Sequence, residues 1–279
     1  MNILDPEAAE VTPLQFQPRQ PKRQGRRDTF QLPYITVVVV VTSVAGWSDR
    51  RERIRAQFPR NVRLIPDNGE QSVLLKFAVG RHGPSQEVIS NVTLEAAKFA
   101  DILMLDCLDE DDSLNTQANW ALTAGVSATT SKVMLSVKWA VRHFDFDYFF
   151  RLGDDSYFRI DKFMSMISDQ QIPARSAVVG HILHDHVFGE LQPYPQGMGY
   201  GLTYDVCIFI AGNEGHLLNT APEDCVVARW LMAVGAKFID SPHWRDIALG
   251  EGCEPDMVLA HKLPADLWSN ITDSGTIEC

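Results

Sequence analysis

The sequence contains no hydrophobic run long enough to cross a membrane. No window approaches the roughly 18 consecutive apolar residues expected of a spanning helix. The first ten residues, MNILDPEAAE, lack the charged and then apolar pattern of a signal peptide. We therefore expect either a soluble protein or a chain from which a membrane anchor has been removed.

Basic charge and cysteine are also scarce. The 279 residues include 25 Lys and Arg against 36 Asp and Glu, which gives a formal charge of -11. Nucleic-acid binding through phosphate contacts needs a basic face, so this balance argues against a nucleic-acid partner. The five cysteines show no CxxC or Cys/His zinc spacing, which argues against a zinc site. Acidic sites for other divalent cations remain open.

Two N-glycosylation sequons, at Asn91 and Asn270, are typical of a secreted or luminal chain. Each sequon alone is weak, because the pattern is short and common by chance. In an oxidising compartment one or two disulfides can form among the cysteines. The cysteines are Cys107, Cys207, Cys225, Cys253 and Cys279.

Apolar runs alternate with helical patterns in the first part of the chain. Residues 1–32, rich in Pro, Gln and basic side chains, predict a disordered stem or linker. The predicted strands are 34–44, 73–80, 100–109 and one that begins near Asp147. The predicted helices are 48–58, with Ser48 as N-cap, and 131–144. This alternation predicts an α/β fold with a mostly parallel sheet, whose ligands lie beyond the carboxyl ends of its strands.

Two adjacent acids, Asp154 and Asp155, follow the apolar strand near residue 150. Such a pair can place one carboxylate on a hard divalent cation and the other on a nearby hydroxyl. Gly-Asp-Asp-Ser is also good turn composition, so a solvated turn is an equal alternative.

Two later segments carry further candidates. QPYPQGMGYGLTYDV, residues 192–206, predicts a loop in which glycines allow close backbone approach and tyrosines can stack on a sugar or a base. A tight connection without a ligand is the equal alternative. PEDCVVARWLMAVG predicts a helix with Pro222 at its first position and Glu223 and Asp224 in its first turn, where acids favour the helix dipole anyway.

Taken in order, these segments resemble the inverting β1,3-glycosyltransferases, a family that includes β1,3-galactosyltransferases, β1,3-N-acetylglucosaminyltransferases and fringe. The similar segments are RRERIRAQF, ADILMLDCLDEDDSL, TTSKVMLSVKW, RLGDDSYFRID, QPYPQGMGYGLTYDV, PEDCVVARWL and EPDMVLAHKLPADLW. The resemblance covers residues 34–270 and implies a GT-A-type, Rossmann-like nucleotide-binding sheet flanked by helices. It also implies a catalytic domain over 33–279, with a UDP-sugar-binding half at 33–160 and an acceptor-binding half at 161–279.

The resemblance also assigns roles to residues of this sequence. It implies Asp155 and His261 as metal ligands and Asp224 as the general base. The residues expected to contact the UDP-sugar are Arg51, Arg55, Asp106, Lys132 and Asp154. The residues expected near the acceptor or the donor sugar are Tyr194, Gly199, Tyr200 and Glu223. Gly153 stands where the family has the first of three consecutive acids.

The implied reaction is metal-dependent transfer of galactose from UDP-galactose to a glycan or glycoprotein hydroxyl in β1,3 linkage. A mixed Asp/His site favours Mn²⁺ over Mg²⁺. UDP-N-acetylglucosamine is the alternative donor, and a non-catalytic sugar-binding member is the alternative class that Gly153 permits. The family implies the Golgi or the secretory-pathway lumen, usually with a membrane anchor.

An apolar-flanked Gly-Asp-Asp also occurs in RNA polymerases. The chain length, the acidic balance and the lack of a basic template groove make a nucleotidyltransferase the weaker interpretation.

Overall fold

The computed structural model describes residues 32–58, 72–109, 126–252, 254–262 and 268. The predicted stem, apart from Leu32, and the sequon at Asn270 lie outside the described residues. The described residues belong to one unit, Leu32–Cys279. In the part of the chain that the structure describes, no helix is long and apolar enough to cross a bilayer.

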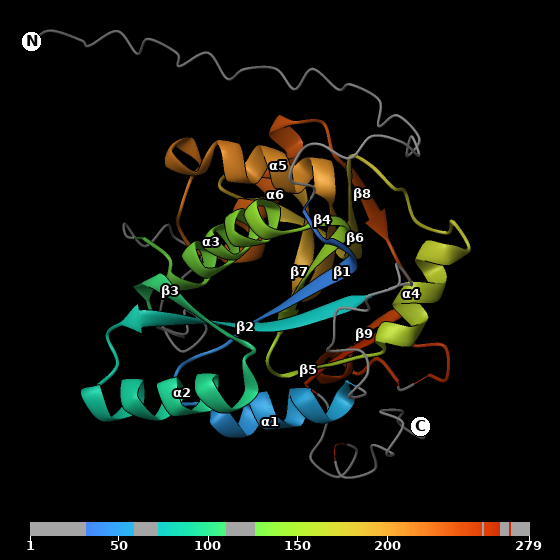
Figure 1. The fold of residues 1–279 in the computed structure, drawn as a ribbon. Coiled ribbons are helices and arrows are strands. Elements are labelled where there is room, and N and C mark those ends of the chain that lie inside the picture. The colour runs from blue at the N-terminus through green and yellow to red at the C-terminus, as the bar shows by residue number, and fades with distance from the viewer. Residues whose placement is uncertain (1–31, 59–71, 110–125, 253, 263–267, 269–279) are drawn as a thin grey trace, which may run out of the picture. The chain divides into compact units, whose positions relative to one another are not determined.

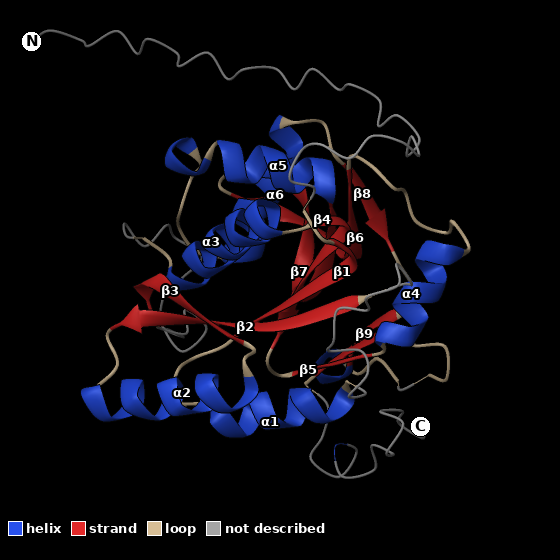
Figure 2. Cartoon of the chain, viewed as in Figure 1, coloured by secondary structure: helices blue, strands red, loops and turns tan. Residues whose placement is uncertain are grey.

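A seven-stranded mixed sheet forms the centre of this unit (Figures 1 and 2). Its strand order is β3-β2-β1-β4-β7-β6-β8. The strands are β1 Tyr34–Thr42, β2 Val73–His82, β3 Ile102–Leu108, β4 Asp145–Gly153, β6 Ala177–Val187, β7 Glu190–Thr203 and β8 Lys237–Asp240. β7 runs antiparallel to β4 and β6, and the other neighbours are parallel. The predicted mostly parallel sheet is confirmed, and β1, within the predicted strand at 34–44, lies between β2 and β4.

Helices cover both faces of the sheet (Figure 1). One face carries α1 Ser48–Gln57, α2 Gln86–Phe99, α4 Ile160–Ser168 and a small sheet of β5 Ser156–Phe158, β10 Leu259–His261 and β9 Trp244–Asp246. The other carries α3 Ala128–His143, α5 Tyr204–Gly212 and α6 Glu223–Ala233. Two 3₁₀ turns, Glu214–His216 and Ile247–Leu249, complete the described elements. The α/β fold class is confirmed.

Three predicted helix starts need correction. Ser48 is the first helical residue of α1, and Trp47 occupies the N-cap position. α3 begins at Ala128, three residues before the predicted start, because the Ser127 side chain caps it by accepting a hydrogen bond from the Thr130 N–H at 3.0 Å. Pro222 is the N-cap of α6 instead of its first helical residue.

The prediction of a loop at 192–206 is wrong, because most of this segment forms β7. Tyr194, Met198, Tyr200 and Leu202 are buried, and residues 198–203 are buried without a break. The strand therefore lacks the alternation of apolar and polar residues that identifies a half-buried strand, and its prolines and glycines are typical of a loop. The glycines are needed for packing: a Cβ at Gly199 would lie 2.6 Å from a leucine methyl of β10.

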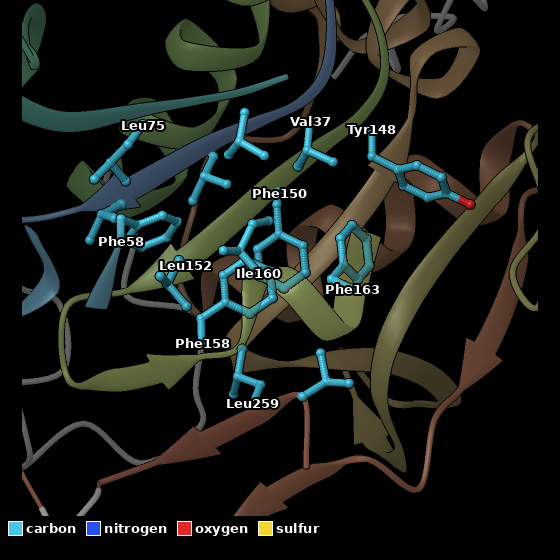
Figure 3. Packing of buried hydrophobic residues seen from close by; sticks show 14 of the residues in the cluster. Val37, Phe58, Leu75, Tyr148, Phe150, Leu152, Phe158, Ile160, Phe163 and Leu259 are labelled. Atoms are coloured by element: carbon cyan, nitrogen blue, oxygen red, sulfur yellow. The ribbon is translucent and has the colours of Figure 1, made fainter. Parts of the chain in front are cut away.

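Aromatic packing joins the large sheet to the small sheet (Figure 3). Phe150 of β4 stacks on Phe158 of β5, with ring centroids 4.1 Å apart, and meets Phe163 of α4 edge-on at 4.9 Å. Trp244 of β9 closes the cluster and donates its indole N–H to the Gly199 carbonyl at 3.0 Å. This cluster holds in place the segment that follows β4 and the segment that precedes β10.

Both predicted halves of the domain contribute strands to the large sheet, since β1 to β4 precede residue 160 and β6 to β8 follow it. The division into donor and acceptor halves stays a prediction. The cysteines within the described residues, Cys107, Cys207 and Cys225, are buried and free, so the expected disulfides are not found among them.

We predict that Phe150→Ala lowers the free energy of unfolding by about 3–5 kcal/mol, because it removes the ring at the centre of the aromatic cluster. Leu191→Ala, at a position that is 64% exposed, is the control and should change it by less than about 0.5 kcal/mol. Urea denaturation measures both. Equal effects of the two substitutions would contradict the central role of Phe150.

Candidate active site

One buried carboxylate ties together the carboxyl ends of β1, β2 and β3. Asp109, directly after β3, accepts hydrogen bonds from the N–H groups of Ala45 at 2.6 Å and Gly80 at 2.8 Å. The ammonium of Lys132 lies 2.8 Å from the same carboxylate. A Cβ at Gly80 would lie 2.3 Å from a carbonyl oxygen of β3, so glycine is required where these strands approach. Asp109 therefore shapes this edge of the sheet.

Lys132, predicted to contact the UDP-sugar, is buried against this edge. Besides Asp109, it contacts the Ser43 carbonyl, to which it donates at 2.8 Å. Asp106, which was also predicted to contact the UDP-sugar, lies on the edge strand β3 and is exposed. It contacts His82, with 2.8 Å between the imidazole and the carboxylate. The predicted donor contacts of Lys132 and Asp106 stay predictions.

Arg51 and Arg55 are held in ion pairs between α1 and α2. Arg51 is fully buried, lies 2.7 Å from Glu95, and donates to two carbonyls of the loop between β1 and α1. Arg55 lies 2.7 Å from Glu95 and 2.8 Å from Asp101. Both arginines stabilise the loop and the helix pair, and their predicted contact with the UDP-sugar stays a prediction.

The arginine that faces the Asp-Asp motif is Arg50, which the sequence analysis did not select. Its guanidinium lies 3.7 Å from the centre of the Trp47 ring and 2.9 Å from a carboxylate oxygen of Asp154. About a third of the Arg50 side chain is exposed, at 32%. Its position directly after the β1–α1 loop was the available signal, because strand-to-helix turns of α/β sheets bind phosphates.

The two acids of the motif have different environments. Asp154 is buried, and burial raises its pKa in spite of the neighbouring Arg50. One of its carboxylate oxygens has no hydrogen-bond partner among the described residues. The Asp155 carboxylate lies 3.3 Å from Nε2 of His261. Burial would raise the pKa of Asp155, but the hydrogen bond and charge of His261 outweigh it and lower the pKa.

The predicted metal ligands, Asp155 and His261, therefore face each other. Burial would lower the pKa of His261, but Asp155 and Asp246 outweigh this effect and raise it. Among the described residues no group of three His, Cys, Asp or Glu side chains is arranged to hold a metal ion. The pair fits a divalent cation that takes its remaining ligands from a bound substrate. The residue before Asp155 is Asp154, whose buried oxygen has no hydrogen-bond partner among the described residues.

Gly153 is tightly enclosed at the end of β4. A Cβ at this position would lie 3.0 Å from the Asp155 carboxylate, 3.2 Å from the Ser156 hydroxyl and 3.3 Å from the Met198 carbonyl. A third acid at this position would have to displace these neighbours. Asp155 and Met198 thus occupy the space around the position where the related family has its first acid.

The predicted base, Asp224, begins a second cluster at the start of α6. One of its oxygens accepts the Gly197 N–H at 3.0 Å and the other accepts the Cys225 N–H at 2.9 Å. Burial raises the pKa of Asp224, and these backbone hydrogen bonds only partly oppose the shift. A carboxylate with a raised pKa and a fixed orientation is suited to accept a proton.

Arg151 connects this cluster with the Asp-Asp motif. It donates to the Gly197 carbonyl, and its guanidinium lies 3.2 Å from Glu223. Burial opposes its charge, but Glu223 first, and then Tyr200, Asp224 and Asp155, raise its pKa. The Tyr200 hydroxyl donates to Glu223. The structure therefore brings Asp224, Glu223, Tyr200 and Asp155 around one buried arginine.

The remaining predicted residues lie around β7. Gly199 accepts the Trp244 indole N–H and packs against β10. Tyr194 is buried against Cys225 and Ala228 of α6, so its ring belongs to a hydrophobic cluster. The predicted sugar contacts of both residues stay predictions.

The chain is similar to known glycosyltransferases. No protein-family model matches the chain. Mouse β-1,3-galactosyltransferase 6 is 24% identical over 244 residues, a match that covers 81% of this chain and 69% of the relative. The resemblance to the β1,3-glycosyltransferases is confirmed.

Solved glycosyltransferase structures show a weaker similarity. The galactosyltransferase LgtC, solved with donor and acceptor sugar analogues, has a TM-score of 0.40 at 9% identity, with 82% of this chain and 87% of that chain covered. The glycosyltransferase GlyE of Streptococcus pneumoniae TIGR4 has a TM-score of 0.42 at 11% identity, covering 83% of this chain and 55% of that chain. Mouse xyloside xylosyltransferase 1 has a TM-score of 0.38 at 10% identity, covering 81% and 96%.

We predict that Asp109→Asn destabilises the protein by about 3–5 kcal/mol, because the charge of buried Lys132 would then lack its counter-ion. Thermal and urea unfolding measure the loss. Asp49→Asn removes the carboxylate of an exposed pair with Arg53 and is the control, expected to cost less than about 1 kcal/mol. If Asp109→Asn were as mild as the control, the pair would not organise the sheet edge.

The Asp155 and His261 pair predicts a pH-dependent stability of the metal-free protein. The raised pKa of His261 means that its contribution is complete below its ordinary value of 6.5 and is lost as the pH rises through the raised pKa. The lowered pKa of Asp155 means that its contribution is complete above 3.8 and is lost as the pH falls through the lowered pKa.

In EDTA, the difference in stability between the native protein and His261→Gln should therefore be largest between pH 3.8 and pH 6.5. Urea midpoints of both proteins across the pH range measure the difference. A difference that stays constant from acid to alkaline pH would contradict an ion pair at this position.

Proposed function

We propose that the chain is a metal-dependent inverting β1,3-glycosyltransferase that transfers galactose from UDP-galactose to a hydroxyl of a glycan or glycoprotein. The observation that carries this proposal is the network around Arg151, which joins a carboxylate and histidine pair to a carboxylate with a raised pKa. The relationship to a β-1,3-galactosyltransferase supports the donor and the linkage. The family supports the Golgi or secretory-pathway lumen as the location.

Asp155 and His261 would hold Mn²⁺, with Mg²⁺ as the alternative, because an imidazole ligand favours Mn²⁺. When bound, the cation neutralises the diphosphate and so makes UDP a better leaving group. Arg50 supplies a further positive charge beside Asp154 and is partly exposed. We therefore assign to Arg50, at the start of α1, the diphosphate contact that the sequence analysis expected of Arg51 or Arg55.

Asp224 would remove the proton from the acceptor hydroxyl as that oxygen attacks the anomeric carbon. The Gly197 and Cys225 N–H groups hold its two oxygens, so the carboxylate keeps one orientation. The acceptor oxygen attacks from the face opposite the leaving UDP, so one displacement converts an α-linked donor into a β-linked product. This route needs no covalent intermediate, and the chain's carboxylates suffice for it.

UDP-N-acetylglucosamine is the alternative donor within the same reaction. No contact of the described residues distinguishes the two sugars, so the assay must compare them. A non-catalytic sugar-binding protein is the alternative class. The fixed orientation and raised pKa of Asp224 favour an enzyme, because simple sugar binding does not need a proton acceptor.

We predict that Asp224→Asn reduces transfer by about two orders of magnitude or more, as expected when a general base is lost. The variant should still bind UDP with Mn²⁺, because the substitution leaves Asp155 and His261 unchanged. Transfer from UDP-galactose and UDP-N-acetylglucosamine to a panel of glycan acceptors measures activity.

Asp256→Asn is the matched control, since Asp256 is an exposed carboxylate that pairs with His243 outside the proposed site. It should transfer at the native rate. Near-native transfer by Asp224→Asn would remove Asp224 from the role of base. Absence of transfer and of sugar-nucleotide hydrolysis by the native protein would favour the non-catalytic alternative.

A further inference from the structure

Asp246 is a buried carboxylate beside the proposed metal ligands, and the mechanism above gives it no role. It lies on β9 and is only 3% exposed. Its Oδ2 lies 3.2 Å from Nδ1 of His261 and 2.5 Å from Nε2 of Gln196. The same oxygen makes both contacts, so rotation of the carboxylate would move it away from the imidazole and from the amide.

The two ring nitrogens of His261 therefore face two different carboxylates. Nδ1 faces Asp246 and Nε2 faces Asp155. When the ring is neutral, a proton on Nδ1 is shared with Asp246 and leaves the Nε2 lone pair toward Asp155. Either neutral tautomer places a ring lone pair against a carboxylate. The Asp155 side chain is 39% exposed and the Asp246 side chain is 5% exposed, so water or a bound cation can relieve the repulsion at Nε2 but not at Nδ1. The arrangement therefore favours the tautomer in which Nε2 is available as a ligand.

Gln196 extends this contact toward the proposed base. It precedes Gly197, whose N–H holds Asp224 and whose carbonyl accepts from Arg151. The Asp246 and Gln196 hydrogen bond thus joins β9 to the segment of β7 that positions Asp224. The β9 backbone is itself held to β10, because Asp246 pairs in register with His261.

We propose that Asp246 is a positioning residue that fixes the tautomer and orientation of His261 for a divalent cation, and that Gln196 holds Asp246 in place. This inference rests on the proposed function, because it assumes that His261 binds a metal. Asp246 acts only through His261 and is not itself a ligand, as the imidazole lies between it and Asp155.

The test is a calorimetric titration of Mn²⁺ into the protein in the presence of excess UDP. Asp246→Asn should weaken Mn²⁺ binding by about 10- to 100-fold, the usual effect of losing a carboxylate that orients a metal-bound histidine. Raising the Mn²⁺ concentration should restore UDP binding by Asp246→Asn to the native affinity, a result that a general loss of structure would not give. The loss of transfer should shrink as Mn²⁺ is raised, so that the defect falls on the KM for the metal more than on kcat.

Asp256→Asn removes the carboxylate from the exposed pair with His243 and is the matched control, expected to bind Mn²⁺ as the native protein does. Native affinity in Asp246→Asn would overturn the inference while leaving the proposed function intact. No Mn²⁺ binding by the native protein would overturn both.

A second measurement needs no substitution at Asp246. The ring ¹⁵N shifts of His261 in the metal-free native protein, above the pKa of the imidazole, should show a protonated Nδ1 and an unprotonated Nε2. The resonances are assigned by their loss in His261→Gln. A protonated Nε2 would overturn the inference even if Asp246→Asn failed to fold.

Discussion

The backbone of Gly197 is the point on which the proposed site depends. Its N–H donates to Asp224 and its carbonyl accepts from buried Arg151. A Cβ at this position would lie 3.2 Å from the Asp224 carboxylate, so glycine lets the backbone come this close. Arg151 in turn carries the charge that Glu223, Asp224 and Asp155 surround. The backbone of this glycine and one arginine therefore relate the base to the carboxylates that follow β4.

The irregularity of β7 explains how a strand can serve this purpose. Tyr200 pairs with Gly180 and Pro195 pairs with Ile182, so residues 196–199 lie opposite His181 alone. The extra residues turn Gln196 toward Asp246 and Gly197 toward Asp224, and Met198 and Gly199 remain packed against the small sheet. Bulges commonly redirect side chains beside active sites. The aromatic cluster around Phe150 holds both sheets in the register that this requires.

The sequence predicted the parts of the fold in which local pattern and tertiary packing agree. The β-branched run of β1 and the apolar run of β2 are buried on both faces, so composition alone identifies them. The pattern of β7 was hidden because its packing needs glycines and prolines. Asp154 and Asp155 were singled out by their place after an apolar strand. The family resemblance supplied the roles predicted for Asp224 and His261. The sequence did not single out Arg50, Asp109 or Asp246. Several residues of the same charge lie near each of them in the sequence, and the rotation of a helix or the pairing of distant strands decides which one faces the site.

The central claim is that the carboxyl edge of the sheet is a metal-dependent sugar-nucleotide site. The most direct measurement is calorimetric binding of UDP, UDP-galactose and UDP-N-acetylglucosamine to the native protein, each with Mn²⁺ and with EDTA. The account predicts UDP binding that depends on Mn²⁺, and a preference between the two sugars would identify the donor. Absence of binding under both conditions, or equal binding with and without metal, would contradict it.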